Sequence, residues 1–311
     1  MNVRWGLAAL PELLGDRPFL VASERWSDLV EVDATWSEIP SHRIEVPAGS
    51  DSIVAVGGGS AIDTAKAASA ASGLPLVSVP TTYSGAEWTV FFGVRDPERR
   101  LRGGGAGAHP TGIVYEPKLT LELPVAQTVG TALNALAHCA EALYVEGHNV
   151  EADGEAVAGA RLIGRWLPQV VERPRDLEAR TQLLRAACHG GAALAKSFLA
   201  LGHAMAQALG GRYGLPHGAM NALALPPALR FNAEAAPAAV AQFGAALGSR
   251  DPAGRVEELA RLGGFERLRD FGVPQDDLGA VAEAVVERAG AKANPRPATQ
   301  AEVAQLLRSI W

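Results

Sequence analysis

The stretch VAVGGGSAIDTAKA, residues 54–67, constrains the fold more than any other part of the chain. An apolar run typical of a buried strand ends in three consecutive glycines, and a helix-like segment with polar residues one turn apart follows. Glycines at the end of a strand let the backbone approach a ligand without a Cβ clash. The N–H groups of such a turn and of the helix behind it attract an anion such as a pyrophosphate. The usual G-x-G-x-x-G spacing is absent, so the stretch alone also fits a tight strand-to-helix turn that binds nothing.

Up to Pro124, short apolar segments alternate with turn residues. Strands are predicted at 18–23, 42–47, 52–59, 74–82 and 112–117. A helix is predicted with Ser60 as its N-cap and Gly73 as its C-terminal stop. Strand, helix and strand at this spacing indicate parallel βαβ units.

After Pro124 the pattern becomes helical. Long Ala- and Leu-rich helices are predicted at 125–147 and 152–171 and within 177–214, and short helices continue over 251–311. The sequence therefore predicts an α/β domain at 1–123 followed by an all-α domain at 124–311.

Composition excludes several function classes. The formal net charge of −6 gives no basic footprint for nucleic acid, and the apolar runs are too short or interrupted to span a membrane. The start, MNVRWGLAAL, lacks the long apolar core of a signal peptide. The only cysteines, Cys139 and Cys188, do not form a disulfide framework. These features predict a cytoplasmic enzyme with a small-molecule substrate and no nucleic-acid or membrane partner.

Several sequence blocks together resemble the iron-dependent (group III) alcohol dehydrogenase family. In chain order they are GGGSAIDTAK, VPTTYSGAEWT (79–89), IVYEPKLTLELP (113–124), LNALAHCAEALY (133–144) and GHAMAQALGGRYGLPHGAMNA (202–222). The resemblance implies a shortened dehydroquinate synthase-like fold, in which 1–123 is a Rossmann-like dinucleotide-binding domain and 124–311 carries the substrate and metal site. It also implies NAD or NADP as cofactor and a homodimer.

The resemblance assigns cofactor contacts to residues that match the family motifs. The pyrophosphate turn corresponds to Gly57, Gly58, Gly59 and Ser60. Asp63 matches the aspartate that faces the ribose on the nicotinamide side, and Thr81 and Thr82 match threonines near the adenine side. Arg100 lies near the position of a cofactor-binding lysine, and Ser23 or Glu24 follows the first strand, where an acidic residue favours NAD. Lys66 is interpreted as a solvated helix charge.

The metal site departs from the family pattern. Family members bind iron through one aspartate and three histidines, and His138, His203 and His217 occupy the three histidine positions. Asn134 stands at the aspartate position, four residues before His138 and on the same helix face. An amide oxygen is a poor ligand for a divalent transition ion, so no metal is expected; if one binds, those histidines are its ligands. Gln207 also stands where many members have a histidine.

LNALAHCAEALY is very similar to the corresponding helix of the maleylacetate reductase branch, which shares the asparagine. That resemblance implies metal-independent, NAD(P)H-dependent reduction of a small keto or enone acid. His203 and His217 are expected to bind or protonate the substrate, with His138 supporting them and Asn134 orienting a substrate oxygen or a water. Weaker candidates for carboxylate recognition are Tyr83, Arg212 and Lys196.

Two other functions remain compatible with the sequence. One is a metal-dependent alcohol dehydrogenase or aldehyde reductase in which Asn134, or a water that it holds, replaces the aspartate. The other is a degenerate, non-redox lyase or cyclase that keeps a bound nucleotide. Metal content discriminates the first of these, and the intact GGGS turn with Asp63 argues against loss of the nucleotide.

Overall fold

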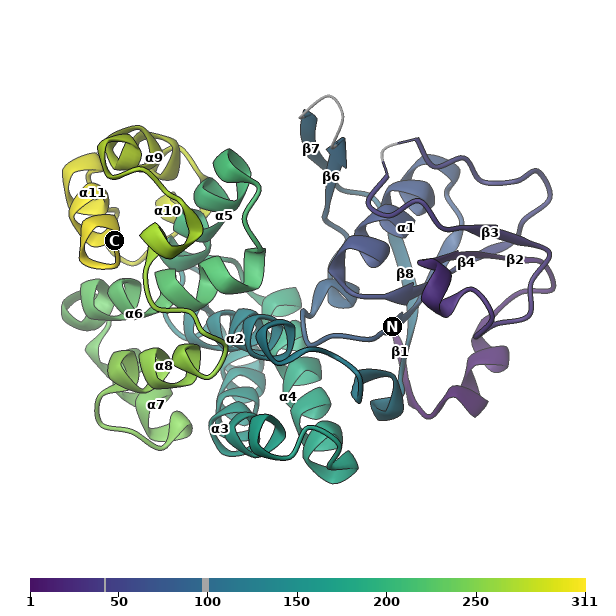
Figure 1. The fold of residues 1–311 in the computed structure, drawn as a ribbon, viewed down its shortest axis with the longest axis horizontal. Coiled ribbons are helices and arrows are strands. Elements are labelled where there is room, and N and C mark those ends of the chain that lie inside the picture. The colour runs from purple at the N-terminus through teal and green to yellow at the C-terminus, as the bar shows by residue number, and fades with distance from the viewer. Residues whose placement is uncertain (42, 97–100) are drawn as a thin grey trace. The chain divides into compact units, whose positions relative to one another are not determined.

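The computed structural model describes residues 1–41, 43–96 and 101–311 (Figure 1). The chain divides into two compact units, Met1–Leu121 and Glu122–Trp311. We call them the sheet unit and the helical unit.

The sheet unit is built on six strands, all paired in parallel, in the order β1-β8-β5-β4-β2-β3. Their bounds are β1 Asn2–Trp5, β2 Pro18–Ala22, β3 Ala34–Trp36, β4 Ser52–Gly57, β5 Pro75–Pro80 and β8 His109–Tyr115. Helix α1, Gly59–Ser72, connects β4 to β5. A separate antiparallel hairpin consists of β6, Phe92–Asp96, and β7, Leu101–Gly105. The six-stranded parallel sheet confirms the predicted α/β class.

Strand β4 is apolar throughout because both faces of the sheet are covered. Ile53 and Ala55 contribute to the core that includes Ile62 of α1. Val54 and Val56 belong to a second core, which also contains Leu20 of β2. Successive side chains of a strand point to opposite faces, so each residue of this run lies in one of two cores.

The edge of the sheet beyond β2 differs from the sequence prediction. The short strand β3 pairs with β2 there, whereas 43–47 forms no strand. Ile44 and Val46 instead pack their side chains against the core beside α1. The alternation of polar and apolar residues in this segment therefore reflects one-sided burial without strand pairing.

The turn after β4 also differs in one detail. Helix α1 begins at Gly59 with Gly58 as its N-cap, so Ser60 lies inside the first turn and is not the cap. The prediction for the other end is confirmed, because Gly73 closes α1 in the left-handed conformation with φ +76°.

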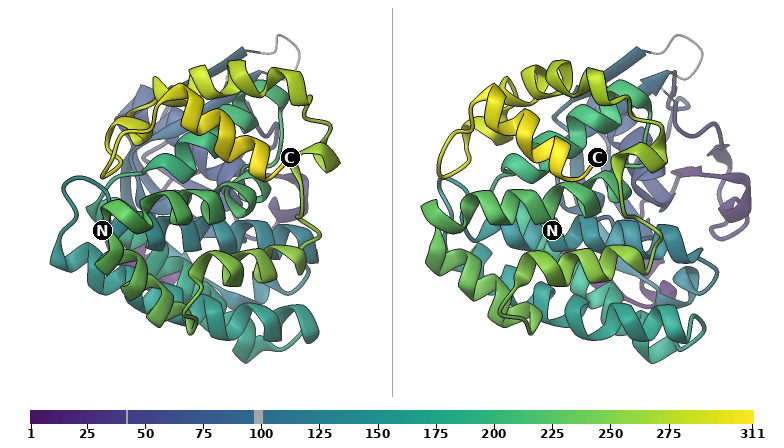
Figure 2. Two further views of the ribbon diagram at one scale, coloured as in Figure 1. Left: turned by 90° about the vertical axis from the view of Figure 1, so that its left-hand side faces the viewer. Right: turned by 60° about the vertical axis from the view of Figure 1, so that its left-hand side comes forward.

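The helical unit contains the predicted long helices and several further ones. Their bounds are α2 Val125–Ala142, α3 Val150–Glu172, α4 Leu177–Lys196, α5 Leu201–Tyr213, α6 His217–Ala235, α7 Pro237–Leu247, α8 Pro252–Arg261, α9 Leu278–Val286, α10 Ala289–Lys292 and α11 Gln300–Ser309. Helix α2 is buried along most of its length and packs against α3, α4 and α6. The C-terminal helices α9 and α11 lie side by side (Figure 2).

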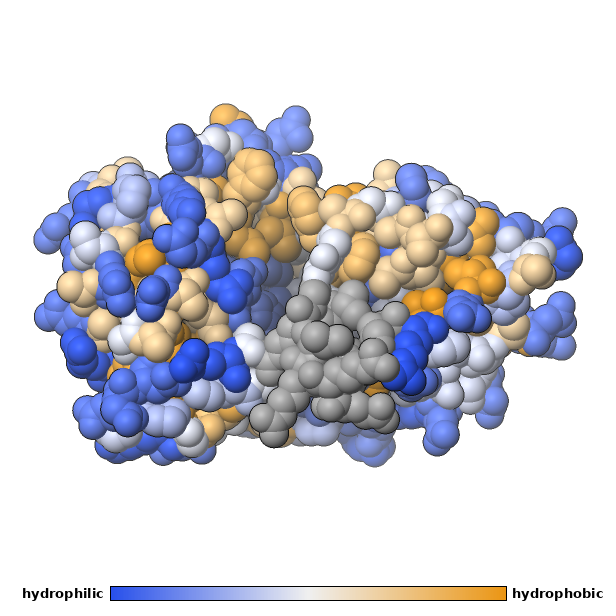
Figure 3. Space-filling model, turned by 90° about the horizontal axis from the view of Figure 1, so that it is seen from above, coloured by the Kyte–Doolittle hydropathy of each residue, from blue (hydrophilic) through white to orange (hydrophobic). Residues whose placement is uncertain are grey.

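The surface of the helical unit is largely hydrophilic in the view of Figure 3, with smaller hydrophobic areas between the polar ones. Among the residues that the structure describes, no helix combines the length and apolar character needed to cross a membrane.

Candidate functional site

The glycine turn of the sheet unit leaves no room for side chains. A Cβ atom on Gly57, where φ is +153°, would lie 2.7 Å from the Cβ of Ala61. On Gly58 it would lie 2.9 Å from the Cγ2 of Thr82. No side chain within the described residues caps the start of α1. The turn therefore has the close backbone approach and the open helix N-terminus that an anionic group requires.

The other predicted cofactor residues surround this turn. Thr81 donates its backbone N–H to the Gly57 carbonyl at 2.9 Å, and Thr82 packs against Gly58. Ser23 and Glu24 follow β2, which pairs with β4, so they leave the sheet at the same edge as Gly57. Arg100 lies outside the described residues.

The side chain of Asp63 forms a hydrogen bond with the β6–β7 hairpin. Its Oδ2 accepts a hydrogen bond from the backbone N–H of Gly93 at 3.1 Å, and its Oδ1 lies 3.8 Å from the Nζ of Lys66. The carboxylate is partly exposed, at 28%. In this structure Asp63 therefore makes protein contacts at the position where the family resemblance expects a ribose contact.

The interpretation of Lys66 as a solvated charge is wrong. Its side chain is 1% exposed, and Nζ donates to the Oγ1 of Thr89 at 3.0 Å and to the carbonyl of Phe91 at 2.8 Å. Burial lowers the pKa of the ammonium, while the negative charges of Asp63 and Glu87 oppose that shift. Lys66 thus connects α1 to the segment before β6. Its two acceptors, Thr89 and Phe91, lie 23 and 25 residues further along the chain, so a local pattern around Lys66 does not reveal them.

We expect Lys66→Met to lower the free energy of unfolding by about 1–3 kcal/mol, because a charged donor is lost while its acceptors remain. Denaturant unfolding followed by tryptophan fluorescence measures the change. The matched control is Lys118→Met, since Lys118 is exposed and its loss should change stability by less than about 0.5 kcal/mol. Equal stabilities of the two variants would contradict a structural role for Lys66.

A buried carboxyl in the sheet unit escaped the sequence analysis. Glu87 is 1% exposed, and its Oε1 accepts a hydrogen bond from the hydroxyl of Tyr115 at 2.7 Å. The same hydroxyl accepts the indole N–H of Trp88 at 2.8 Å. Burial raises the pKa of Glu87, while its own backbone N–H, Tyr115 and Lys66 oppose the shift. The chain of hydrogen bonds ties the loop after β5 to β8.

The helical unit brings the three predicted histidines together. His138 lies on α2, His203 on α5, and His217 opens α6. The rings of His138 and His203 are stacked, with centroids 4.7 Å apart and planes 12° apart. The rings of His203 and His217 are 5.8 Å apart and tilted by 49°. We call these three residues, with Asn134, the histidine cluster.

His203 is held by a carboxylate that the sequence analysis did not single out. Glu141 lies on α2, three residues after His138, and is fully buried. Its Oε2 is 2.7 Å from the Nδ1 of His203, and it also accepts the backbone N–H groups of Ala200 at 2.7 Å and His203 at 2.9 Å. These are N–H groups of the first turn of α5, where a carboxylate is favoured.

This contact fixes the chemistry of the His203 ring. A carboxylate at Nδ1 requires the proton on that nitrogen, which leaves Nε2 as the atom that can accept or donate a proton. Nε2 is buried and has no hydrogen-bond partner among the described residues. Glu141 is thus a positioning residue for His203. The sequence feature that could have identified it is its position on the predicted helix, about one turn after His138.

His138 has a different role because it cannot easily carry charge. Burial lowers its pKa well below the usual value, and the neighbouring His203 and His217 add to the shift. Its Nδ1 is buried without a hydrogen-bond partner in the described part of the chain. The ring of His138 is stacked on that of His203, in surroundings that disfavour its charged form.

Asn134 faces another amide. The Nδ2 of Asn221, on α6, donates to the Oδ1 of Asn134 at 2.7 Å and lies 3.0 Å from the Nε2 of His217. Asn134 and Asn221 are both buried, and His217 is half-buried.

The donor set differs from the one that the family resemblance implies for iron. Asn134 brings no negative charge, and its Oδ1 accepts a hydrogen bond from the amide of Asn221. Over 1–41, 43–96 and 101–311, no group of three or more His, Cys, Asp or Glu side chains is arranged to hold a metal ion.

The weaker candidates for substrate binding make other contacts. Arg212 forms a bidentate pair with Asp277, at 2.5 Å for each bond. Lys196 pairs with Glu155 at 3.1 Å, and Tyr83 is fully buried in the sheet unit. Gln207 accepts a hydrogen bond of 3.4 Å from Arg288.

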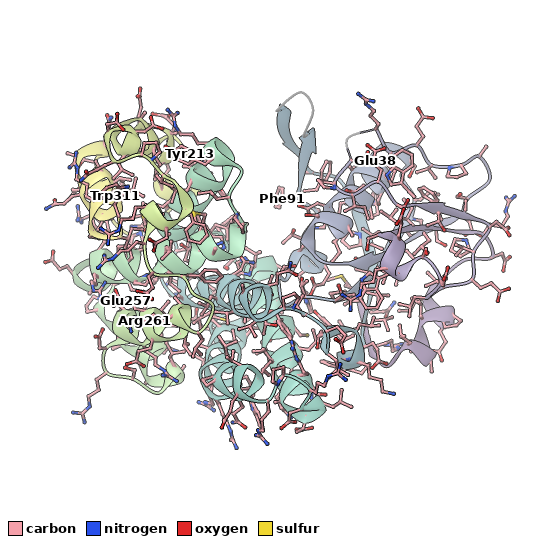
Figure 4. The ribbon with its side chains drawn as sticks, in the orientation of Figure 1. Glu38, Phe91, Tyr213, Glu257, Arg261 and Trp311 are labelled. Carbon is pink, nitrogen blue, oxygen red and sulfur yellow. The ribbon has the colours of Figure 1, made fainter. Side chains whose placement is uncertain are left out.

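A cavity of about 530 Å³ lies elsewhere in the helical unit, lined by α6, α8 and α11. Glu257 and Arg261 of α8, labelled in Figure 4, belong to its wall. Glu257 is paired with Arg230 at 2.6 Å, and Arg296 is paired with Glu302 at 2.8 Å. These two pairs neutralise their own charges, and the wall also contains Arg261, Glu266 and Arg267.

Comparisons with known proteins agree with the fold and the motifs. Residues 28–117 match the family model "Iron-containing alcohol dehydrogenase", and residues 128–311 match "Fe-containing alcohol dehydrogenase family, C-terminal". A maleylacetate reductase of Burkholderia cepacia is 37% identical over 264 residues, which are 85% of this chain and 74% of that protein.

Solved structures give the same result. A putative alcohol dehydrogenase of Ralstonia eutropha JMP134 superposes with a TM-score of 0.89 at 31% identity, over 100% of this chain and 95% of that one. A maleylacetate reductase of Agrobacterium tumefaciens gives a TM-score of 0.88 at 27% identity, over 100% and 95% of the two chains. Together with the glycine turn and the histidine positions, these matches show that the chain belongs to the iron-containing alcohol dehydrogenase family, is similar to its maleylacetate reductases, and is an NAD(P)H-dependent oxidoreductase.

Proposed function

We propose that the protein is a metal-independent, NAD(P)H-dependent reductase of a small keto or enone acid. The class of substrate follows the printed names of its maleylacetate reductase relatives. The proposal rests on the Glu141–His203 pair, which leaves the buried Nε2 of His203 without a hydrogen-bond partner among the described residues. In the same cluster, Asn134 stands where the family resemblance expects an aspartate. Residues 1–123 would bind the dinucleotide and residues 124–311 the substrate.

In the sheet unit, the proposed cofactor contacts are those of the glycine turn. The close approach at Gly57 and Gly58 and the N-terminus of α1 at Gly59 and Ser60 suit a pyrophosphate. The other proposed contacts are Asp63, Thr81 and Thr82. The bound dinucleotide supplies the hydride.

In the helical unit, the proposed chemistry is proton transfer. Reduction of a carbonyl or an enone places negative charge on oxygen, which a proton donor can neutralise in the absence of a metal. His203 would give the proton from Nε2, and the Glu141 carboxylate would hold the ring in place through Nδ1. His138 remains neutral and keeps the ring of His203 in place by stacking.

The test measures metal content and turnover on the same preparation. We expect the purified protein to carry substoichiometric iron and zinc by elemental analysis and to oxidise NADH or NADPH with maleylacetate as test substrate. Dialysis against a chelator should leave kcat unchanged, because no step requires an ion. Stoichiometric metal whose removal abolishes turnover would instead favour the metal-dependent alcohol dehydrogenase, and the screen would then turn to aldehydes and primary alcohols.

A further inference from the structure

We propose that Arg288 binds a carboxylate group of the substrate and thereby selects small acids over neutral carbonyl compounds. The inference rests on the proposed reduction of a keto or enone acid and adds a specificity-determining residue to it. The sequence analysis considered Tyr83, Arg212 and Lys196 for this task. In the structure, Arg212 and Lys196 pair with carboxylates of the protein itself.

Arg288 lies beside the helix that carries His203. It follows α9 and precedes α10, and both of these helices pack against α5. Its Nη1 lies 3.4 Å from the Oε1 of Gln207, and its Nη2 lies 3.4 Å from the carbonyl oxygen of the same residue. Gln207 stands four residues after His203, so the two side chains share one face of α5, about 6 Å apart along its axis. The guanidinium is therefore held next to the turn of α5 that follows His203.

This part of α5 is accessible to a ligand in solution. Gln207 is half-buried, whereas every other residue from Leu201 to Gly210 is buried. Arg288 is half-buried as well. The contact between Arg288 and Gln207 thus marks the place where the buried helix α5 reaches the surface.

The charge of Arg288 has no carboxylate partner in the part of the chain that the structure describes. The adjacent carboxylate, Glu287, pairs with Lys292 at 3.0 Å. The Nε of Arg288 is buried and has no hydrogen-bond partner among the described residues. Burial lowers the pKa of the guanidinium, and no described negative charge opposes that shift. A partly desolvated cation whose acceptors are two neutral oxygens at long distance is stabilised when an anion binds to it.

A carboxylate is the anion that suits this position. The planar guanidinium donates parallel N–H groups to both oxygens of a carboxylate. A small acid whose reacting carbon lies at His203 can place its carboxylate at Arg288, because a few carbon–carbon bonds of about 1.5 Å each span a distance of this order. A neutral aldehyde or alcohol has no group that could neutralise the charge. Arg288 therefore favours acids.

The experiment measures binding and turnover in the full-length wild-type protein and in Arg288→Gln. The binding probe is adipate, a dicarboxylate without a keto group or a double bond, titrated calorimetrically in the presence of NADH. We expect Arg288→Gln to bind adipate about ten- to a hundredfold more weakly, the effect of one hydrogen bond to a charged group. With maleylacetate, KM should rise by a similar factor while kcat changes less than about threefold.

Two further measurements separate recognition of a carboxylate from a structural role. The affinity for dimethyl adipate, the neutral ester, should be the same in wild type and Arg288→Gln, because the ester carries no charge for Arg288. Arg288→Lys should recover part of the adipate affinity, because it keeps a positive charge but not the planar fork. A change in stability alone would not distinguish the acid from its ester.

The matched control is Arg255→Gln. The side chain of Arg255 is 30% exposed and donates to the carbonyl oxygen of Gly164 at 3.3 Å, but it lies on α8 and also pairs with Glu258. Its replacement should leave the affinity for adipate unchanged. If Arg288→Gln does not fold by circular dichroism, Arg288→Met replaces it, because methionine fills the space of the arginine stem. Wild-type adipate affinity in the folded variant, an equal loss in Arg255→Gln, or no adipate binding by the wild-type protein would overturn the role of Arg288.

The two proposals fail in different ways. Adipate binding that depends on Arg288, in a protein that oxidises neither NADH nor NADPH with maleylacetate, refutes the reductase and keeps the carboxylate site. Turnover of maleylacetate with the same KM in wild type and Arg288→Gln refutes only the carboxylate site.

Discussion

Replacement of His203 by asparagine is expected to lower kcat by about 10²–10⁴-fold, the usual contribution of a positioned acid or base. Asparagine keeps an N–H at the δ position for the carboxylate of Glu141, so the buried charge retains a partner. It removes Nε2, which is the atom proposed to give the proton. NADH and NADPH affinities, measured by fluorescence titration, should stay within about twofold of wild type because the nucleotide contacts proposed here are in the other unit. Stopped-flow oxidation of the nucleotide with maleylacetate measures the catalytic step.

The control for this variant is His189→Ala. His189 is a histidine of α4 whose side chain is 37% exposed and whose Nδ1 lies 2.7 Å from Glu155. It pairs with a carboxylate as His203 does, but it is not part of the histidine cluster. We expect its replacement to leave kcat within about twofold of wild type. Unchanged turnover in His203→Asn, or an equal loss in both variants, would rule out His203 as the proton donor.

Gly58→Val is expected to weaken NADH and NADPH binding by about ten- to a hundredfold. A Cβ at this position would already lie 2.9 Å from the Cγ2 of Thr82, and the branched side chain of valine needs still more room. Overpacking typically costs about 1–3 kcal/mol, and each 1.4 kcal/mol is a factor of about ten in affinity. The displaced turn would also lose its alignment with the N-terminus of α1.

Gly154→Ala serves as the control because an added Cβ there meets nothing within 4 Å, on the exposed side of α3. Its nucleotide affinity should equal that of wild type, and alanine should stabilise the helix slightly. Circular dichroism and thermal unfolding check that both variants are folded. Wild-type nucleotide affinity in folded Gly58→Val would refute the pyrophosphate-binding turn.

Local sequence patterns were sufficient to predict the strand, the turn and the helix around the three glycines. The apolar run, the glycines and the C-terminal stop at Gly73 act over neighbouring residues, so β4 and α1 could be located to within about two residues. The long helices after Pro124 could be predicted for the same reason. The short strands β1 and β3 could not, because their residues form strands through pairing with β8 and β2.

The sequence by itself determined the class of fold, the family and the positions of the three histidines, because these depend on periodicity and on motifs of fixed spacing. Only the tertiary structure decided which groups those residues contact. The partner of His203 is Glu141, 62 residues away, and the partner of Asn134 is Asn221, 87 residues away. The sequence pattern around Lys66 is typical of an exposed charge, whereas in the fold its Nζ donates hydrogen bonds to the segment 89–91 and is buried. These contacts form only when helices α2, α5 and α6 pack together, or when the loop at 89–91 packs against α1. A local sequence pattern does not specify which residues come into contact over such separations in the chain.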